Sequence, residues 1–312
     1  MKVELVRFRN RAATEPIREG LLIIMAAPEP RAWHIVSTNK SPSVPCLAIK
    51  SGPDDDSKGL EQTASIYTNT QPLTMLEALR RLDEIEADAA DMHVTVDVSC
   101  MPRPVMAEVF AKLFAIAGRR ELTITVFYAL ASYTPPPGHL PPNEAIRPVH
   151  PAFAGWPKDV SASTAIIVGL GYEKDKAEGA CEYFDPSETW VFTPRSPISE
   201  YDVDVAANNA SFMERTERDR RIEYRVDDPE RTFGELVSVA MSILPRSTPL
   251  ILPFGPKIFF ATSLFVSLLY EDIGVWLITG DLAVQQSNHT SSGTNIAFEA
   301  KLRPADTAPD EA

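Results

Sequence analysis

Short apolar runs alternate along the chain with longer stretches in which apolar residues recur every three or four positions. The short runs have the length of buried strands, and the longer stretches have the period of amphipathic helices. Residues 3–8 are a candidate edge strand. The first half is therefore predicted to read β-α-β-α-β-α-β, with strands over residues 21–27, 45–50, 93–99 and 121–130. A short segment at 28–38 separates the first two strands, and helices are predicted over 73–89 and 104–118.

The second half repeats the alternation and ends in a possible extra strand at residues 294–302. Five strands separated by helices predict a mostly parallel sheet that is wound on both faces, with right-handed crossovers. The predicted strands are residues 164–171, 189–194, 221–226, 249–255 and 274–280, and the predicted helices are 172–184, 199–217, 229–244 and 256–270.

Residues 134–160 separate the halves and are very rich in proline. Because proline removes a backbone donor and fixes φ, we expect no regular element there, only a linker or a long surface loop. The predicted fold class is α/β, with two tandem Rossmann-like βα units and mostly parallel sheets flanked by helices. The expected domains are residues 1–133 and 161–302, followed by a disordered tail at 303–312.

The charge balance narrows the classes of partner. The 312-residue chain has a formal net charge of −13, which disfavours binding to extended nucleic acid but allows a local pocket for one phosphorylated ligand. No apolar run is long enough for a membrane helix, and no signal peptide is visible, so a soluble cytoplasmic protein is expected. The three widely spaced cysteines are predicted to be reduced, and the cysteines and histidines show no metal-ligand spacing.

In a parallel sheet, ligands bind beyond the carboxyl ends of the strands, where helix N-termini present free N–H groups. The loop after the strand at 93–99 contains Asp97, Ser99, Cys100 and Arg103. A helix N-terminus and Arg103 would both favour a thiolate at Cys100, so this loop is a candidate anion site or a candidate nucleophile. The alternative is a buried cysteine, with Asp97 and Arg103 serving as a cap and an ion pair. Glu29 and Arg31 follow the first buried strand.

Two further loops belong to the second half. Gly169, Gly171, Tyr172 and Glu173 form a strand–GxG–helix turn that lacks the third glycine of a dinucleotide fingerprint, so no cofactor is predicted. The alternative reading is that the glycines only permit a tight turn.

The next strand of the second half ends in Thr193 and Arg195. A later loop places Gly255 and Lys257 at the start of an apolar helix, which suits contact with a phosphate. In a fourth loop, Asp281 is expected to cap a helix.

The segment PFGPKIFFATSLF resembles the strand–GGTK–helix signature of CARF-type sensor domains and their SAVED relatives in bacterial antiphage systems. The stretch GLGYEKDKAEGACEYFDPSETWVFTP is similar to the early βα unit of those proteins. The resemblance covers roughly residues 164–281. It implies a cyclic oligonucleotide ligand, contact through Gly255 and Lys257 with residues 169–172 opposite, and a homodimer. One glycine is missing, and proline replaces the threonine of the signature.

Three hypotheses follow. The leading one is a nucleotide-binding sensor or accessory protein of a bacterial defence or signalling system, with an effector protein as a possible partner and with contacts at residues 97–103, 169–173 and 255–257. A second is an enzyme that acts on a nucleotide or related metabolite through Cys100 or Asp97. A third is a scaffold that binds another protein.

Overall fold

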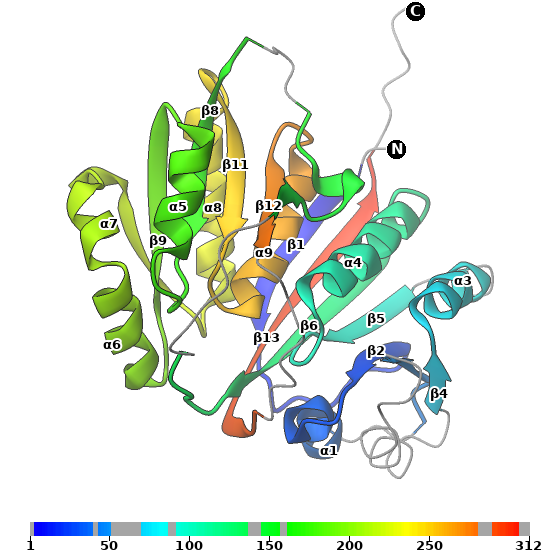
Figure 1. Cartoon of the computed structure of the whole chain (residues 1–312). Coiled ribbons are helices and arrows are strands. Elements are labelled where there is room, and N and C mark those ends of the chain that lie inside the picture. Colours follow the sequence, from blue (N-terminus) through cyan, green and yellow to red (C-terminus); the bar gives the residue numbers. More distant parts are fainter. Residues whose placement is uncertain are drawn as a thin grey trace, which may run out of the picture. The chain divides into compact units, whose positions relative to one another are not determined.

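The computed structural model describes residues 3–39, 43–50, 70–86, 92–136, 145–156, 161–279 and 289–305. The chain divides into two compact units, each with its own sheet (Figure 1). Unit 1 comprises Met1–Ser132 and Ser287–Ala312, and unit 2 comprises Tyr133–Gln286.

Unit 1 contains a seven-stranded sheet in the order β1-β13-β6-β5-β2-β3-β4. The five strands from β6 to β4 are mutually parallel, and β13 pairs antiparallel with both β6 and β1. The expected edge strand at the N-terminus is confirmed, because β1 ends the sheet. The strands are β1 Val3–Arg11, β2 Leu21–Ala26, β3 Cys46–Lys50, β4 Thr70–Leu73, β5 Met92–Asp97, β6 Leu122–Ala131 and β13 Ser291–Pro304.

Helices pack against both faces of this sheet. On one face, Ile35 and Val36 contribute to a core with apolar side chains of β2, β3 and β6. Helix α4 has eight buried residues, as expected for an element that covers a sheet. The helical elements of unit 1 are η1 Pro30–Trp33, α1 His34–Thr38, α3 Met75–Glu86 and α4 Arg103–Ala117.

Unit 2 contains a six-stranded sheet in the order β10-β9-β8-β11-β12-β7. Its first five strands are parallel, and only the edge strand β7 is antiparallel. The strands are β7 Ala145–Pro148, β8 Ser163–Gly169, β9 Glu188–Arg195, β10 Arg221–Arg225, β11 Ser247–Pro253 and β12 Gly274–Thr279.

Both faces of the second sheet are also covered. One core joins α5, α6 and α7 to β8, β9 and β11, whereas Phe259 of α9 packs on the other face against Phe192 and Tyr224. The predicted doubly wound α/β class is therefore confirmed. The helical elements are η2 Pro151–Phe153, α5 Lys176–Phe184, α6 Ser199–Asn208, α7 Ala210–Arg215, η3 Arg218–Arg220, α8 Pro229–Ile243 and α9 Lys257–Leu269.

Two expected boundaries need correction. Strand β13 lies in the predicted second domain, but it completes the first sheet, because its inward-facing residues Ile296, Phe298 and Ala300 are buried against unit 1. It also includes Arg303 and Pro304, which were assigned to the tail. The proline-rich stretch was expected to hold no regular element, yet it contributes β7 and η2 to unit 2. An edge strand can accept Pro148, because one side of its backbone has no ladder partner.

The two sheets share one winding scheme. In each, the first parallel strand is central, the next two extend the sheet on one side, and the last two extend it on the other. The winding direction reverses between β2 and β5 in unit 1, and between β8 and β11 in unit 2. These reversal points are where open parallel sheets leave a crevice at their carboxyl ends.

Candidate ligand-binding site at the carboxyl ends of the first sheet

The loop after β2 and the loop after β5 flank the reversal point of unit 1. We call this place the crevice of unit 1, after the general rule for open parallel sheets. The β2 loop supplies Glu29 and Arg31, and the β5 loop supplies Cys100 and Arg103. Strand β6 lies beside β5 and contributes Tyr128 from its carboxyl half. These five side chains form what we call the unit 1 crevice cluster. The sequence analysis predicted the β5 loop and noted the two residues after β2.

Arg31 occupies the centre of the crevice cluster. Its residue surface is only 5% exposed, although it carries a full positive charge. The guanidinium donates from Nη2 to Glu29 Oε1 at 3.1 Å and from Nη1 to the carbonyl oxygen of Ala129 at 3.4 Å. Glu29 is also buried, and its Oε2 accepts from the backbone N–H of His289 at 3.3 Å. The arginine therefore spans from the end of β2 to the end of β6.

The electrostatics of Arg31 link the two loops. Burial lowers its pKa, but the negative charges that Cys100, Tyr128 and Glu29 can carry outweigh burial, so that the net shift is upward. Burial raises the pKa of the Tyr128 phenol, against the opposing charges of Arg31 and Arg103. Tyr128 is thus kept neutral and can act as a hydrogen-bond donor beside two cations. The crevice cluster is suited to an anion that carries several oxygen acceptors.

Arg103 is the first residue of α4, a helix of 15 residues. No side chain caps the N-terminus of this helix, where Pro102 is the N-cap residue. A helix N-terminus carries a partial positive charge, which adds to that of the arginine. Cys100, three residues earlier, is half-buried and forms no disulfide. The predicted anion-binding chemistry of this loop is therefore retained as a candidate.

Asp97 and Ser99 order the same loop. The Ser99 hydroxyl donates to Asp97 Oδ1 at 2.5 Å and accepts from the backbone N–H of Ala129 at 2.8 Å. The backbone N–H of Ser99 also donates to Asp97 Oδ1, at 2.9 Å. Ser99 is fully buried and Asp97 is 2% exposed. Both side chains therefore hold the end of β5 against β6, below the surface that a ligand would reach.

In unit 2, the two loops expected to meet do lie together. The backbone N–H groups of Phe254 and Gly255 both donate to the carbonyl oxygen of Gly169, at 2.9 and 3.0 Å. Asn208 and Asn209 close the turn from α6, with side-chain amides that donate to the carbonyl oxygens of Tyr172 and Gly171. The turn after β8 is thus fixed by its neighbours.

The glycines of these loops allow close packing. A Cβ on Gly171 would lie 2.7 Å from the carbonyl oxygen of Phe254, and one on Gly255 would lie 2.8 Å from that of Leu170. At Gly169 a Cβ would overlap the ring of Phe259. Backbone and aromatic atoms therefore occupy the space that a ligand would need beside these residues. Glu173 is half-buried in the same turn, and Lys257 is the half-buried first residue of α9.

Thr193 and Arg195 lie on β9, one strand away from the reversal point. Arg195 pairs with Glu223 of β10 and lies 4.0 Å from Asp202 of α6. Two carboxylates thus offset its charge.

Arg103 and Lys257 were both expected to contact the ligand, but they follow strands of different sheets. Asp281, the expected helix cap, lies outside the described residues.

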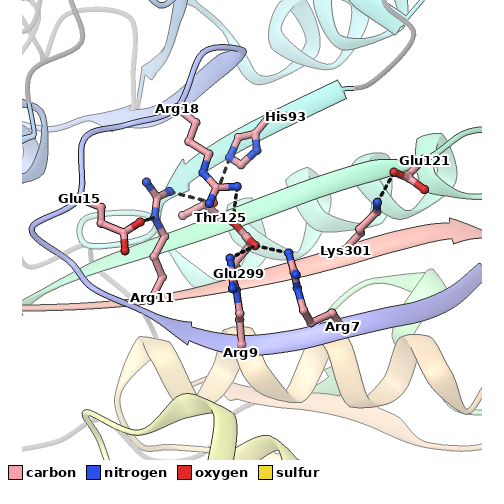
Figure 2. Close-up of polar contacts among 10 residues, drawn as sticks. All are labelled: Arg7, Arg9, Arg11, Glu15, Arg18, His93, Glu121, Thr125, Glu299 and Lys301. Carbon is pink, nitrogen blue, oxygen red and sulfur yellow. Dashed lines mark hydrogen bonds and ion pairs between the residues drawn. The ribbon is translucent and has the colours of Figure 1, made fainter.

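The sequence analysis missed a group of arginines on the first sheet. Arg7, Arg9 and Arg18 all contact the buried carboxylate of Glu299, and Arg11 lies beside them (Figure 2). The signal was visible as arginines at every second position in VRFRNR, which alternation places on one face of a strand. Glu299 is nearly 300 residues away in sequence, so the pairing itself was not predictable.

Unit 2 also has an open cavity of about 290 Å³ at the amino end of β9. Part of its polar lining is paired: Arg215 contacts Glu178, and the buried Glu188 accepts from Arg246 at 2.8 Å and from Trp190 at 3.1 Å. The described residues contain no group of three or more potential metal ligands.

A comparison with models of protein families gave no match, and neither did a comparison with curated proteins. Among the helices that the structure describes, none combines the length and the apolar character needed to cross a lipid bilayer.

Proposed function

We propose that this chain binds a small phosphorylated ligand, such as a nucleotide or cyclic oligonucleotide, in the crevice of unit 1 and acts as a sensor or accessory protein in bacterial defence or signalling. The observation that carries the proposal is the buried Arg31, which lies between the strand-end loops beside Cys100 and Tyr128. Arg103 at the start of α4 adds a second cation at the same edge.

The chemistry supports a phosphate. Guanidinium groups match the geometry of phosphate oxygens through paired N–H donors, and a helix N-terminus adds to the attraction. The Nε atom of Arg31 is buried and has no hydrogen-bond partner in the described part of the chain. A homodimer and an effector partner stay predictions from the resemblance described above, and a cytoplasmic location stays a prediction from the sequence.

The test is thermal unfolding of the whole chain with and without mononucleotides and cyclic oligonucleotides. A ligand at a hundred times its Kd stabilises a protein by about 2.7 kcal/mol, which a melting curve resolves readily. Arg103→Gln should reduce this stabilisation by at least half. Arg81→Gln is the matched control, because Arg81 is a half-exposed arginine of unit 1 that pairs with one carboxylate on α3.

The proposal fails if no nucleotide at millimolar concentration raises the melting temperature. It also fails if Arg81→Gln and Arg103→Gln reduce the stabilisation equally, since that result indicates only a general effect of charge. Arg31→Lys offers a second variant: it keeps the charge but loses the planar fork, so ligand affinity should fall.

The enzyme hypothesis has one specific observation in its favour, the half-buried Cys100 thiol beside Arg31. Under that hypothesis, Cys100→Ser abolishes turnover of a bound nucleotide and leaves its binding intact. If the variant turns the nucleotide over at the wild-type rate, Cys100 is not the nucleophile.

A further inference from the structure

Four arginines gather on one face of the first sheet (Figure 2). Arg7, Arg9 and Arg11 lie at alternate positions of β1, and Arg18 lies in the segment between β1 and β2. Arg7 and Arg9 each place an Nη2 atom on Glu299 Oε1, at 2.8 and 3.0 Å. Arg18 places Nη1 at 2.8 Å from the other carboxylate oxygen. We call Arg7, Arg9 and Arg18 the arginine trio.

The arginine trio carries more charge than its carboxylate can offset. Glu299 is fully buried and supplies one negative charge against three positive ones. Arg11 does not alter this balance, because it pairs with Glu15 at 3.1 Å. Since two guanidinium groups share a single oxygen, they lie within about 6 Å of each other, where like charges repel.

The polar groups that the structure describes beneath the trio do not offset its excess charge. His93 contacts Thr125 at 3.0 Å on the same face, but burial, aided by the charge of Arg18, lowers its pKa to about 4. His93 is therefore neutral at pH 7. Next to Thr125, Thr95 has a fully buried hydroxyl that forms no hydrogen bond within the described residues. The cluster thus combines surplus positive charge with surplus hydrogen-bonding capacity.

The arginine side chains remain accessible. Those of Arg7, Arg9 and Arg18 are 47%, 43% and 43% exposed, although one carboxylate holds all three. Each guanidinium has five N–H donors, and the contact with Glu299 uses only part of them. A purely structural ion pair needs one cation for one anion. Three convergent and accessible cations are the arrangement that a multivalent oxyanion requires.

We propose that the arginine trio is a binding site for a phosphate-bearing anion with two or more negative charges, separate from the crevice of unit 1. Glu299 holds the three guanidinium groups together, and the incoming anion offsets the remaining charge. The arginines would contact the phosphate groups of inorganic and organic anions in the same way, so the experiment has to distinguish these two kinds of ligand. The inference does not depend on the function proposed for the crevice.

The experiment is isothermal titration of the whole chain with inorganic pyrophosphate and, separately, with ATP, at low ionic strength and without divalent cations. Saturable binding is expected for the wild type. Arg9→Gln and Arg7→Gln should each weaken affinity by about tenfold or more, because each removes charge-assisted hydrogen bonds to the anion. Arg81→Gln should change affinity less than twofold. ATP binding tighter than pyrophosphate identifies an organic phosphate as the preferred source, and the reverse identifies an inorganic one.

A melting curve separates this site from a structural network. If the trio binds an anion, Arg7→Gln leaves the melting temperature nearly unchanged without ligand, because repulsion is relieved as one contact is lost. It then removes the stabilisation by pyrophosphate. Absence of saturable binding overturns the proposal, and so does a large fall in the melting temperature of Arg7→Gln with unaltered pyrophosphate affinity. Arg103→Gln should retain pyrophosphate binding at the trio, so that failure of the crevice proposal is recognised independently.

Discussion

Arg31 donates a hydrogen bond from Nη1 to the main-chain carbonyl oxygen of Ala129, 98 residues further along the chain, at 3.4 Å. The contact joins the loop after β2 to the carboxyl end of β6 and passes the end of β5, because β5 lies between β2 and β6 in the sheet. Ala129 also donates its N–H to the Ser99 hydroxyl, so one peptide segment of β6 serves both strand-end loops. The geometry of the unit 1 crevice therefore depends on how β6 is held.

Ser99→Ala should destabilise unit 1 by about 1–3 kcal/mol, because it leaves the buried N–H of Ala129 without its hydrogen-bond partner and removes one of the two hydrogen bonds that Asp97 Oδ1 accepts from Ser99. Urea unfolding followed by circular dichroism measures this change. Ser238→Ala is the control: Ser238 is exposed on α8, and its hydroxyl only contacts the carbonyl of the preceding turn. Equal stability of the two variants would contradict the role given to Ser99.

Gly171→Ala should destabilise unit 2, whereas Gly234→Ala should stabilise it. A Cβ at Gly171 meets a backbone carbonyl at 2.7 Å, so the two turns must move apart at a cost of about 1–3 kcal/mol. Gly234 lies within α8, where a Cβ meets nothing within 4 Å, and alanine favours a helix by about 1 kcal/mol. Chemical denaturation of both variants gives the two signs. The packing argument is wrong if Gly171→Ala is neutral.

The stability of unit 1 should fall as the pH drops from 6.5 toward 4. Burial, followed by the charge of Arg18, lowers the pKa of His93 to about 4 in the folded state, so the unfolded chain takes up this proton first. The resulting loss is about 2 kcal/mol at pH 5. Glu299 adds to this loss of stability at lower pH. Burial raises the pKa of Glu299, but the charges of Arg18 and Arg9 lower it by more than burial raises it. The ionised carboxylate therefore stabilises the fold, and this contribution is lost as the pH falls below the usual titration range of a glutamate.

His93→Gln checks the assignment, because glutamine keeps a polar group near Thr125 but does not titrate. Urea unfolding at pH 7 and pH 5 should show a smaller loss for this variant than for the wild type. His34, whose pKa is also lowered by burial, remains in both proteins and cancels in the comparison. Identical losses would mean that His93 does not control the acid sensitivity.

Only one of the three thiols should react in the folded protein at neutral pH. Burial raises the pKa of Cys46 and of Cys181 to about 12, and both are buried, whereas Cys100 is half-buried at the crevice. Iodoacetamide labelling followed by mass spectrometry should therefore modify Cys100 first. A nucleotide bound in the crevice should slow that reaction. Faster labelling of Cys46 than of Cys100 would contradict the structure.

The sequence predicted the site only where local pattern was sufficient. The loop that holds Ser99 and Arg103 was found because an apolar β-branched run ends in polar residues before a helix. The resemblance to sensor domains implied that residues 169–172 lie opposite Gly255, and the two loops do meet. The reason for these glycines was not predictable, because the atoms that exclude a Cβ come from Phe254, Leu170 and Phe259.

The alternation of apolar strands with amphipathic helices by itself determined the α/β class, since each element must bury its own apolar side. Strand order depends on contacts between distant segments, so only the tertiary structure assigned β13 to the first sheet and brought Glu299 beside Arg7 and Arg9. It also decided that Arg103 and Lys257 follow strands of different sheets. Local periodicity reports which face of an element is buried, whereas the partner of that face is chosen by packing across the whole chain.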